Sequence, residues 1–183
     1  MDRLIKIVTN IQVLTVAVIT AMFIAALFWF FSISPQDKYA EIQNEVQTLS
    51  ESIRHQYNKK PDYWGLCNQS ALSFVPKNMI RNNKIISKIG REYIVGQNEN
   101  GDVVMPMQRN FMITLKDLNK KACEKIATLT IGKENDYTLQ QIVINNSDAK
   151  VEFIWGGKNG LPVAQDTAIK ICKNKNSISW IFE

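Results

Sequence analysis

Three cysteines and one histidine are the most reactive side chains of this 183-residue chain. Cys67, Cys123 and Cys172 stand 56 and 49 residues apart, which excludes the compact ligand spacings of zinc fingers. A nucleophilic Ser/His/Asp or Cys/His site would have to use His55, the only histidine. His55 falls beside the apolar stripe of a predicted helix, where we interpret it as a partly exposed helix residue. We therefore expect no catalytic site, no metal and no enzyme activity.

Two predicted loops partly resemble a calcium-binding loop and a phosphate-binding P-loop, but each lacks residues that its motif requires. Glu99 and Asp102 flank an Asn-Gly turn but lack the number and spacing of acidic ligands in a calcium loop. The glycine-rich run at 156–160 lacks the Lys-Ser/Thr pair that follows the last glycine of a P-loop. We interpret both as surface turns and expect neither a cofactor nor a small-molecule substrate.

A long apolar segment near the N-terminus predicts a transmembrane helix. No charged residue lies between Lys6 and Asp37, and the 21 residues from Val13 to Ile33 are almost all apolar. A helix of that length spans about 30 Å, the thickness of a bilayer's hydrocarbon core. Because Arg3 and Lys6 precede the span, the positive-inside rule places the N-terminus in the cytoplasm and the rest outside it.

The end of this segment favours an anchor that stays attached over a cleaved signal peptide. Ala25 and Ala26 are followed by five more large apolar residues, Leu27-Phe28-Trp29-Phe30-Phe31, and not by a cleavage site. The predicted organisation is a cytoplasmic tip and transmembrane anchor at 1–36, then an extracytoplasmic domain at 37–183 whose amphipathic helix covers 37–57.

The charge of the chain is mildly basic and evenly spread along the sequence. The net charge is +5, and without Arg3, Lys6 and Asp2 the exported part holds 20 basic and 16 acidic residues. No arginine-rich stripe or stacked-aromatic pattern accompanies them. This distribution indicates a solvated surface, so no nucleic-acid partner is expected.

Residues 37–57 carry one apolar stripe at helical spacing. Apolar residues recur every three or four positions, while Glu41 and Glu45 fall on the other faces of the predicted helix. The stripe consists of Tyr39, Ile42, Val46, Leu49, Ile53 and Tyr57, with Gln56 as an alternative last member. It needs an apolar partner, which we expect to be one face of a sheet.

The remaining sequence predicts strands interrupted by helices, an α+β architecture. The Asn-Gly pair at 100–101 predicts a tight hairpin between two of the strands. Strands are predicted at 84–89, 92–97, 103–107, 110–114, 139–144, 151–155 and 177–182, and helices at 68–74, 115–130 and 163–171.

The cysteines should be oxidised in an exported chain, and an odd number leaves one unpaired. A bond from the C-terminal region to mid-chain would close a long loop, worth about 3–4 kcal/mol in the chain-entropy model. We therefore expect Cys123 to pair with Cys172 and Cys67 to remain free and buried. The alternative is that all three are small core residues.

Four segments, taken in order, resemble the type IV pilins, and especially the type IVb branch of conjugative and virulence pili. They are the helix ending at 52–57, the turn at 64–68 that leads to 71–79, the strand at 111–115 before Ala122-Cys123-Glu124-Lys125-Ile126-Ala127, and Ala168-Ile169-Lys170-Ile171-Cys172 before 178–182. The resemblance implies a long N-terminal helix packed on an antiparallel sheet. It also implies a disulfide between Cys123 and Cys172.

The resemblance further implies a role and partners. A non-enzymatic subunit of a type IV pilus, conjugative pilus or secretion assembly would be a single-pass inner-membrane protein. Its domain would be periplasmic or at the cell surface, and other subunits would contact its N-terminal helix. Pilins usually carry a leader ending in glycine and a glutamate at the fifth mature position. This chain has no glycine before Gly65 and no acidic residue between Asp2 and Asp37, so we expect an accessory subunit with an intact anchor.

The predicted span carries small residues on one face. Ala17, Ala21 and Ala25 lie four positions apart, a spacing that lets helices approach closely in lipid, although alanines are also ordinary filler there. Lateral packing through this face is the first hypothesis. The second is a membrane-tethered periplasmic binding module, a sensor or adhesin on the same scaffold, which a pocket lined by aromatic residues would favour.

Overall fold

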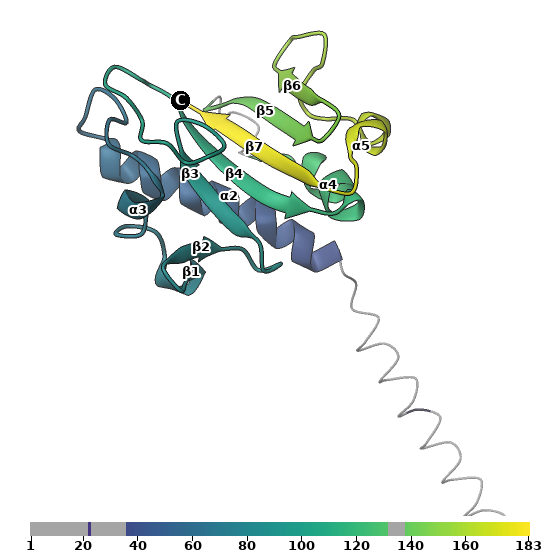
Figure 1. The fold of residues 1–183 in the computed structure, drawn as a ribbon, viewed down its shortest axis with the longest axis horizontal. Coiled ribbons are helices and arrows are strands. Elements are labelled where there is room, and N and C mark those ends of the chain that lie inside the picture. The colour runs from purple at the N-terminus through teal and green to yellow at the C-terminus, as the bar shows by residue number, and fades with distance from the viewer. Residues whose placement is uncertain (1–21, 23–35, 132–137) are drawn as a thin grey trace, which may run out of the picture. The chain divides into compact units, whose positions relative to one another are not determined.

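The computed structural model describes residues 36–131 and 138–183, together with Met22. Within them, one long helix packs on an antiparallel sheet, with short helices at both ends (Figure 1). The long helix, α2 (Gln36–Tyr57), contains neither glycine nor proline, so nothing in its sequence interrupts the helical hydrogen bonds. The predicted α+β class is confirmed.

The strands of the described residues form a single sheet with the order β1-β2-β3-β4-β7-β5-β6. β7, the last element of the chain, lies between β4 and β5 and pairs with both. The C-terminal strand therefore joins the two halves of the sheet. The strands are β1 (Ile80–Arg81), β2 (Lys84–Ile86), β3 (Glu92–Gly96), β4 (Phe111–Leu118), β5 (Leu139–Asn146), β6 (Lys150–Ile154) and β7 (Asn176–Phe182).

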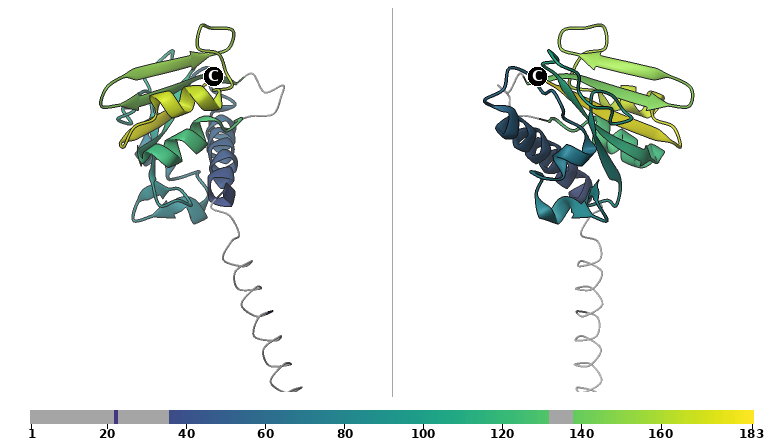
Figure 2. Two further views of the ribbon diagram at one scale, coloured as in Figure 1. Left: turned by 90° about the vertical axis from the view of Figure 1, so that its right-hand side faces the viewer. Right: turned by 60° about the vertical axis from the view of Figure 1, so that its left-hand side comes forward.

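α2 lies against one face of this sheet (Figure 2), and the side chains of its apolar stripe belong to the same core as those of the sheet. Ile42, Val46, Leu49 and Ile53 are fully buried, and Tyr57 is nearly so. The sheet contributes Tyr93, Ile113, Leu115, Ile178, Trp180 and Phe182 to the same core. Because burying one large aliphatic side chain contributes about 1.5–3 kcal/mol, this stripe is sufficient to hold the helix on the sheet.

Aromatic side chains fasten the C-terminal end of α2. The ring of Tyr63 lies 5.5 Å from that of Tyr57 and 4.7 Å from that of Phe111, measured between centroids. Phe111 in turn stacks on Phe182 at 5.5 Å. These ring contacts connect the segment that follows α2 to β4 and, through Phe111, to β7.

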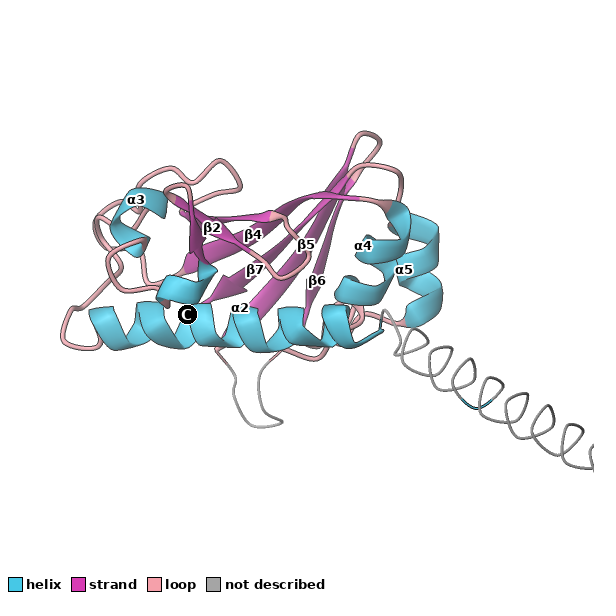
Figure 3. Cartoon of the chain, turned by 90° about the horizontal axis from the view of Figure 1, so that it is seen from below, coloured by secondary structure: helices cyan, strands magenta, loops and turns pink. Residues whose placement is uncertain are grey.

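Short helices flank the sheet at its two ends. They are α3 (Asn68–Ala71), the 3-10 turn η1 (Lys77–Met79), α4 (Lys120–Ala127) and α5 (Gln165–Ile171). Figure 3 shows α4 and α5 at the end of the sheet where α2 begins, and α3 at the end where α2 finishes. The molecule therefore has a proximal end, near Gln36, and a distal end, near Tyr57.

The prediction of a strand at 103–107 is wrong. These residues form a loop beside 64–66, where the Val104 N–H donates to Leu66 O at 2.8 Å and the Gly65 N–H donates to Val104 O at 3.0 Å. Pro106 has no N–H to give to a strand ladder. Gly101 does occupy a tight turn, with φ +80°. After this turn Asp102 pairs with the preceding segment through its carbonyl, which accepts from the Gln97 N–H at 2.8 Å, and the described residues 103–107 form no second strand.

The helix predicted at 115–130 begins too early and ends too late. β4 continues to Leu118, and α4 covers only Lys120–Ala127. Asp117 has φ +57° and interrupts the pairing with β7 between Leu115 and Leu118. Both leucines are buried as a result. Because the strand is irregular at Asp117, its buried leucines are three residues apart, the same spacing as on one face of a helix.

Candidate functional site

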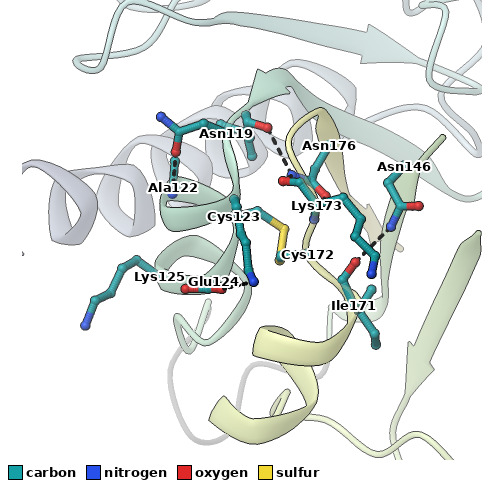
Figure 4. The surroundings of a disulfide bond; sticks show 12 residues. Asn119, Ala122, Cys123, Glu124, Lys125, Asn146, Ile171, Cys172, Lys173 and Asn176 are labelled. Carbon is teal, nitrogen blue, oxygen red and sulfur yellow. Dashed lines mark hydrogen bonds and ion pairs between the residues drawn. A yellow bond between two sulfur atoms is a disulfide. The ribbon is translucent and has the colours of Figure 1, made fainter. Parts of the chain in front are cut away.

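A disulfide joins α4 to the residue that follows α5 (Figure 4). The Cα atoms of Cys123 and Cys172 lie 5.8 Å apart, and both side chains are buried. The bond closes a loop over a sequence separation of 49 residues, and joins the two cysteines that the resemblance pairs. We call residues 116–127, 145–152 and 165–176, which surround it, the disulfide end.

Asparagine side chains hold the loops around this bond. The buried Asn176 accepts from the Lys173 N–H at 2.8 Å through Oδ1 and donates to Leu118 O at 3.0 Å through Nδ2. Asn146 Nδ2 donates to Ile171 O at 2.9 Å. The loop between α5 and β7 is thereby fixed to both β4 and β5.

Sequence reasoning missed these asparagines. A signal existed only for Asn119, whose side chain accepts from the Ala122 N–H at 2.9 Å and so caps α4. Asparagine before a run of helix formers is a common helix start. Asn146 and Asn176 act across distances in the sequence that no local pattern records.

The outer face of α2 is polar. With the apolar stripe occupied by the sheet, the helix presents to solvent the exposed residues Glu41, Asn44, Thr48, Glu51 and His55. They recur every three or four positions, as one helix face requires. A neighbouring molecule that packs against this part of α2 would therefore meet hydrogen-bonding side chains and charges, and no apolar stripe.

Glu45 departs from the prediction that placed it on a polar face of the helix. Its side chain is buried, accepting from the Lys88 N–H and from the Tyr93 hydroxyl, each at 2.9 Å. Burial raises the pKa of Glu45, while these two hydrogen bonds oppose the rise. The carboxylate ties α2 to β3 and to the turn before it, so a charge reversal there would disturb the head itself.

Cys67 is unpaired and partly exposed, although it was predicted to be buried. Burial raises the pKa of its thiol, but hydrogen bonds from the Ser70 N–H, the Ser70 hydroxyl and the Gln69 N–H outweigh that effect and leave the pKa below its ordinary value. The residue precedes α3, where Ser70 Oγ also accepts from the Cys67 N–H at 2.9 Å. Cys67 thus occupies the N-cap position of a short helix.

Apolar side chains are exposed at the distal end. Asp62 joins two loops there, accepting from the Trp64 N–H at 3.2 Å and from the Met107 N–H at 2.7 Å. The exposed apolar residues of these loops are Trp64, Val103, Met105 and Met107, which we call the distal patch. It follows from the loop conformation of 103–107 and was not predicted.

Other predicted features fall outside the described residues or form no site within them. The anchor predicted at 13–33, apart from Met22, and its face of Ala17, Ala21 and Ala25 lie outside the described residues. In the part of the chain that the structure describes, no helix is both long and apolar enough to cross a bilayer, and no His, Cys, Asp or Glu cluster is suited to a metal ion. Asp102 accepts from Asn98 Nδ2 at 2.7 Å within the turn at 98–102, and Glu99 accepts from Asn145 Nδ2 of β5 at 2.9 Å.

Comparison with known proteins places the fold. No family model and no curated protein matches the sequence. The structure is similar to the crystal structure of a type IVb pilin from Salmonella typhi, with a TM-score of 0.51 and 16% identity, covering 75% of this chain and 95% of that one. It is also similar to TcpA, a type IV pilin from the Vibrio cholerae El Tor biotype, with a TM-score of 0.52 and 10% identity, covering 80% of this chain and 99% of that one.

These likenesses lie in the arrangement of elements and not in sequence. The long helix under an antiparallel sheet is the arrangement that the four sequence segments predicted. The fold of this chain is type IV pilin-like.

Proposed function

We propose that the protein is a non-enzymatic pilin-like subunit or accessory component of a type IV pilus, conjugative pilus or secretion assembly. Residues 13–33 anchor it in the inner membrane, and its N-terminal helix makes the contacts of assembly. The observation that carries this proposal is the pilin-like head built on α2, whose sequence continues directly from the predicted span.

The burial pattern of α2 suggests different roles for residues 39–57 and for the predicted span at 13–33. The stripe of residues 39–57 is used inside the head, so the head has its own core. Close packing with other subunits in lipid falls to the face of Ala17, Ala21 and Ala25. Contacts outside the membrane involve the polar face of α2 and the surface of the head.

Shear fractionation of native cells, with intact-mass analysis and in-cell crosslinking, tests the proposal. We expect the protein either in sheared fibres or in the inner membrane, crosslinked to pilus or secretion subunits. The intact mass then shows whether the N-terminus is processed. Recovery as a soluble protein, or in the membrane without any such neighbour, would contradict the proposal.

A hollow at the distal end supports the second candidate, a membrane-tethered binding module. Its volume is about 400 Å³, and Tyr57, Tyr63, Arg54 and Arg109 are among the residues that line it. Lys60, Asp62 and Glu183 also line the hollow, so a planar ligand there would meet aromatic rings beside groups of both charges. A protein that stays in the membrane, has no assembly neighbours and binds a ligand that Tyr63→Ala weakens would favour this candidate over the first.

A further inference from the structure

Lysines that are scattered in the sequence gather in the fold. The disulfide end holds eight lysines and five acidic residues, which leaves the rest of residues 37–183 nearly balanced at 12 basic and 11 acidic. The lysines are Lys116, Lys120, Lys121, Lys125, Lys150, Lys170, Lys173 and Lys175, and the acidic residues are Asp117, Glu124, Asp148, Glu152 and Asp166. These three segments therefore carry three of the four excess positive charges of residues 37–183, and Glu99 from the 97–102 loop borders a hollow there with Lys116 and Lys175.

The charges of these lysines are available to a partner. Lys120 approaches Glu124 at 3.9 Å and Lys150 approaches Glu152 at 3.6 Å, separations at which partly exposed ion pairs are weak. Lys120, Lys173 and Lys175 border one hollow of about 520 Å³ with Ser147, Asp148 and Asn174. Ile169 on α5, also within the disulfide end, has a side chain that is 43% exposed.

The disulfide end lies where the head begins. Figure 3 shows α4 and α5 at the end of the sheet that holds the first turn of α2. The predicted span ends at Ile33, three residues before Gln36, and three residues reach at most about 11 Å. If residues 13–33 cross the bilayer, the start of α2 lies within about 11 Å of the end of the span, a distance comparable with the Debye length of about 8–10 Å over which surface charges act.

We propose that the disulfide end binds anionic phospholipid headgroups of the leaflet on the side of the membrane where the head lies. Lysine ammonium groups near an anionic bilayer are attracted to its negative surface potential, and an exposed isoleucine among them can enter the interface. The contact orients the head on the membrane before assembly. This inference rests on the proposed anchor.

Amine footprinting of the full-length protein in nanodiscs, one copy per disc, tests this contact. Lysine acylation is followed by mass spectrometry in phosphatidylglycerol-rich discs and in phosphatidylcholine discs. A surface potential of about −30 mV raises the proton concentration at the membrane surface about threefold. Since only the neutral amine is acylated, this effect alone slows the acylation of a nearby lysine by about the same factor. We expect at least that protection at Lys120, Lys121, Lys173 and Lys175 in the anionic discs, and its loss at about 1 M salt, where the Debye length is about 3 Å.

Two exposed lysines outside the disulfide end, Lys59 and Lys158, are internal controls and should react equally in both discs. The double variant Lys173→Gln, Lys175→Gln should weaken the protection at Lys120, whereas Lys59→Gln should not. Equal reaction rates at Lys120 and Lys173 in the two kinds of disc would overturn the proposal. So would protection that appears only with two copies per disc and irrespective of lipid charge, since a second subunit would then cover the surface.

The outcomes separate this inference from the proposed function. A protein that does not enter discs at all contradicts the membrane anchor. A protein that enters discs without lysine protection leaves the anchor standing and overturns the lipid contact alone.

Discussion

Glu45 is a residue through which pH acts on the stability of the head. Its carboxylate lies between α2 and the sheet and accepts hydrogen bonds from Tyr93 and from the Lys88 backbone. Burial also raises the pKa of the Tyr93 hydroxyl, and the neighbouring Glu45 raises it further, so this hydroxyl stays protonated and remains a donor at neutral pH. A carboxyl with a raised pKa binds its proton more tightly in the folded head than in the unfolded chain.

The pH dependence of Glu45 therefore runs opposite to that of an ordinary salt-bridged carboxylate. Its contribution to stability is fully present below the unfolded pKa, near 4.5, and is lost as pH rises through the higher folded pKa. The Glu45→Gln variant lacks this contribution. We expect the free energy of unfolding of the wild type, minus that of the variant, to increase as pH falls from 7 toward about 4.5.

Urea unfolding of the full-length protein in detergent, followed by tryptophan fluorescence at several pH values, measures this difference. A difference that stays constant, or that shrinks as pH falls, would contradict the raised pKa of Glu45.

At the scale of elements, α2 is attached by its apolar stripe. Leu49 is fully buried, so Leu49→Ala removes its contacts with the sheet and should lower the free energy of unfolding by about 2–5 kcal/mol. The neighbouring Thr48 is exposed, and Thr48→Ala should change it by no more than about 0.5 kcal/mol. Denaturant titration of both variants checks the pair. Similar effects at the two positions would mean that α2 is not packed through this face.

The disulfide is a second attachment, between α4 and the C-terminal part of the chain. For a sequence separation of 49 residues, the chain-entropy model gives about 4 kcal/mol of stabilisation. The double variant Cys123→Ala, Cys172→Ala should lose about that much, whereas Cys67→Ala should not change the response to reducing agent. A wild-type protein that unfolds at the same denaturant concentration with and without reductant would show that the bond does not stabilise the head.

The sequence predicts most elements because their patterns are local. The stripe of α2 and the alternation in β7 each repeat over several residues, so pattern and structure agree. The hairpin of β1 and β2 was missed, although Asn82 and Asn83 both adopt positive φ, as a two-residue turn between strands requires. β1 has only two residues, too few for a periodic signal.

The errors arise where tertiary contacts override local pattern. Leu115 and Leu118 have helical spacing, yet both lie in a strand because the pairing shifts at Asp117. Glu45 occupies a polar position of the helix but finds buried donors from residues far along the chain. The lysine surface is likewise invisible in the sequence, since three separate segments supply it.

At the scale of the whole molecule, the head presents three different surfaces. The disulfide end is rich in lysine, the outer face of α2 is polar, and the distal patch is apolar. The distal patch lies at the distal end of the head, away from the start of α2. The apolar stripe of α2 is occupied, which leaves the small-residue face of the predicted span as the proposed site of lateral assembly.

Cysteine crosslinking in native membranes tests that central proposal most directly. In the predicted helix of residues 13–33, Ala21→Cys places a thiol on the face of Ala17 and Ala25, and Phe23→Cys places one about 200° around the helix axis. Both are made in a Cys67→Ser background, where serine suits the position before a helix. We expect oxidation to crosslink Ala21→Cys to itself or to a partner subunit carrying a matching cysteine, with little product from Phe23→Cys. Equal crosslinking at both positions, or none at either, would contradict assembly through this face of the N-terminal helix.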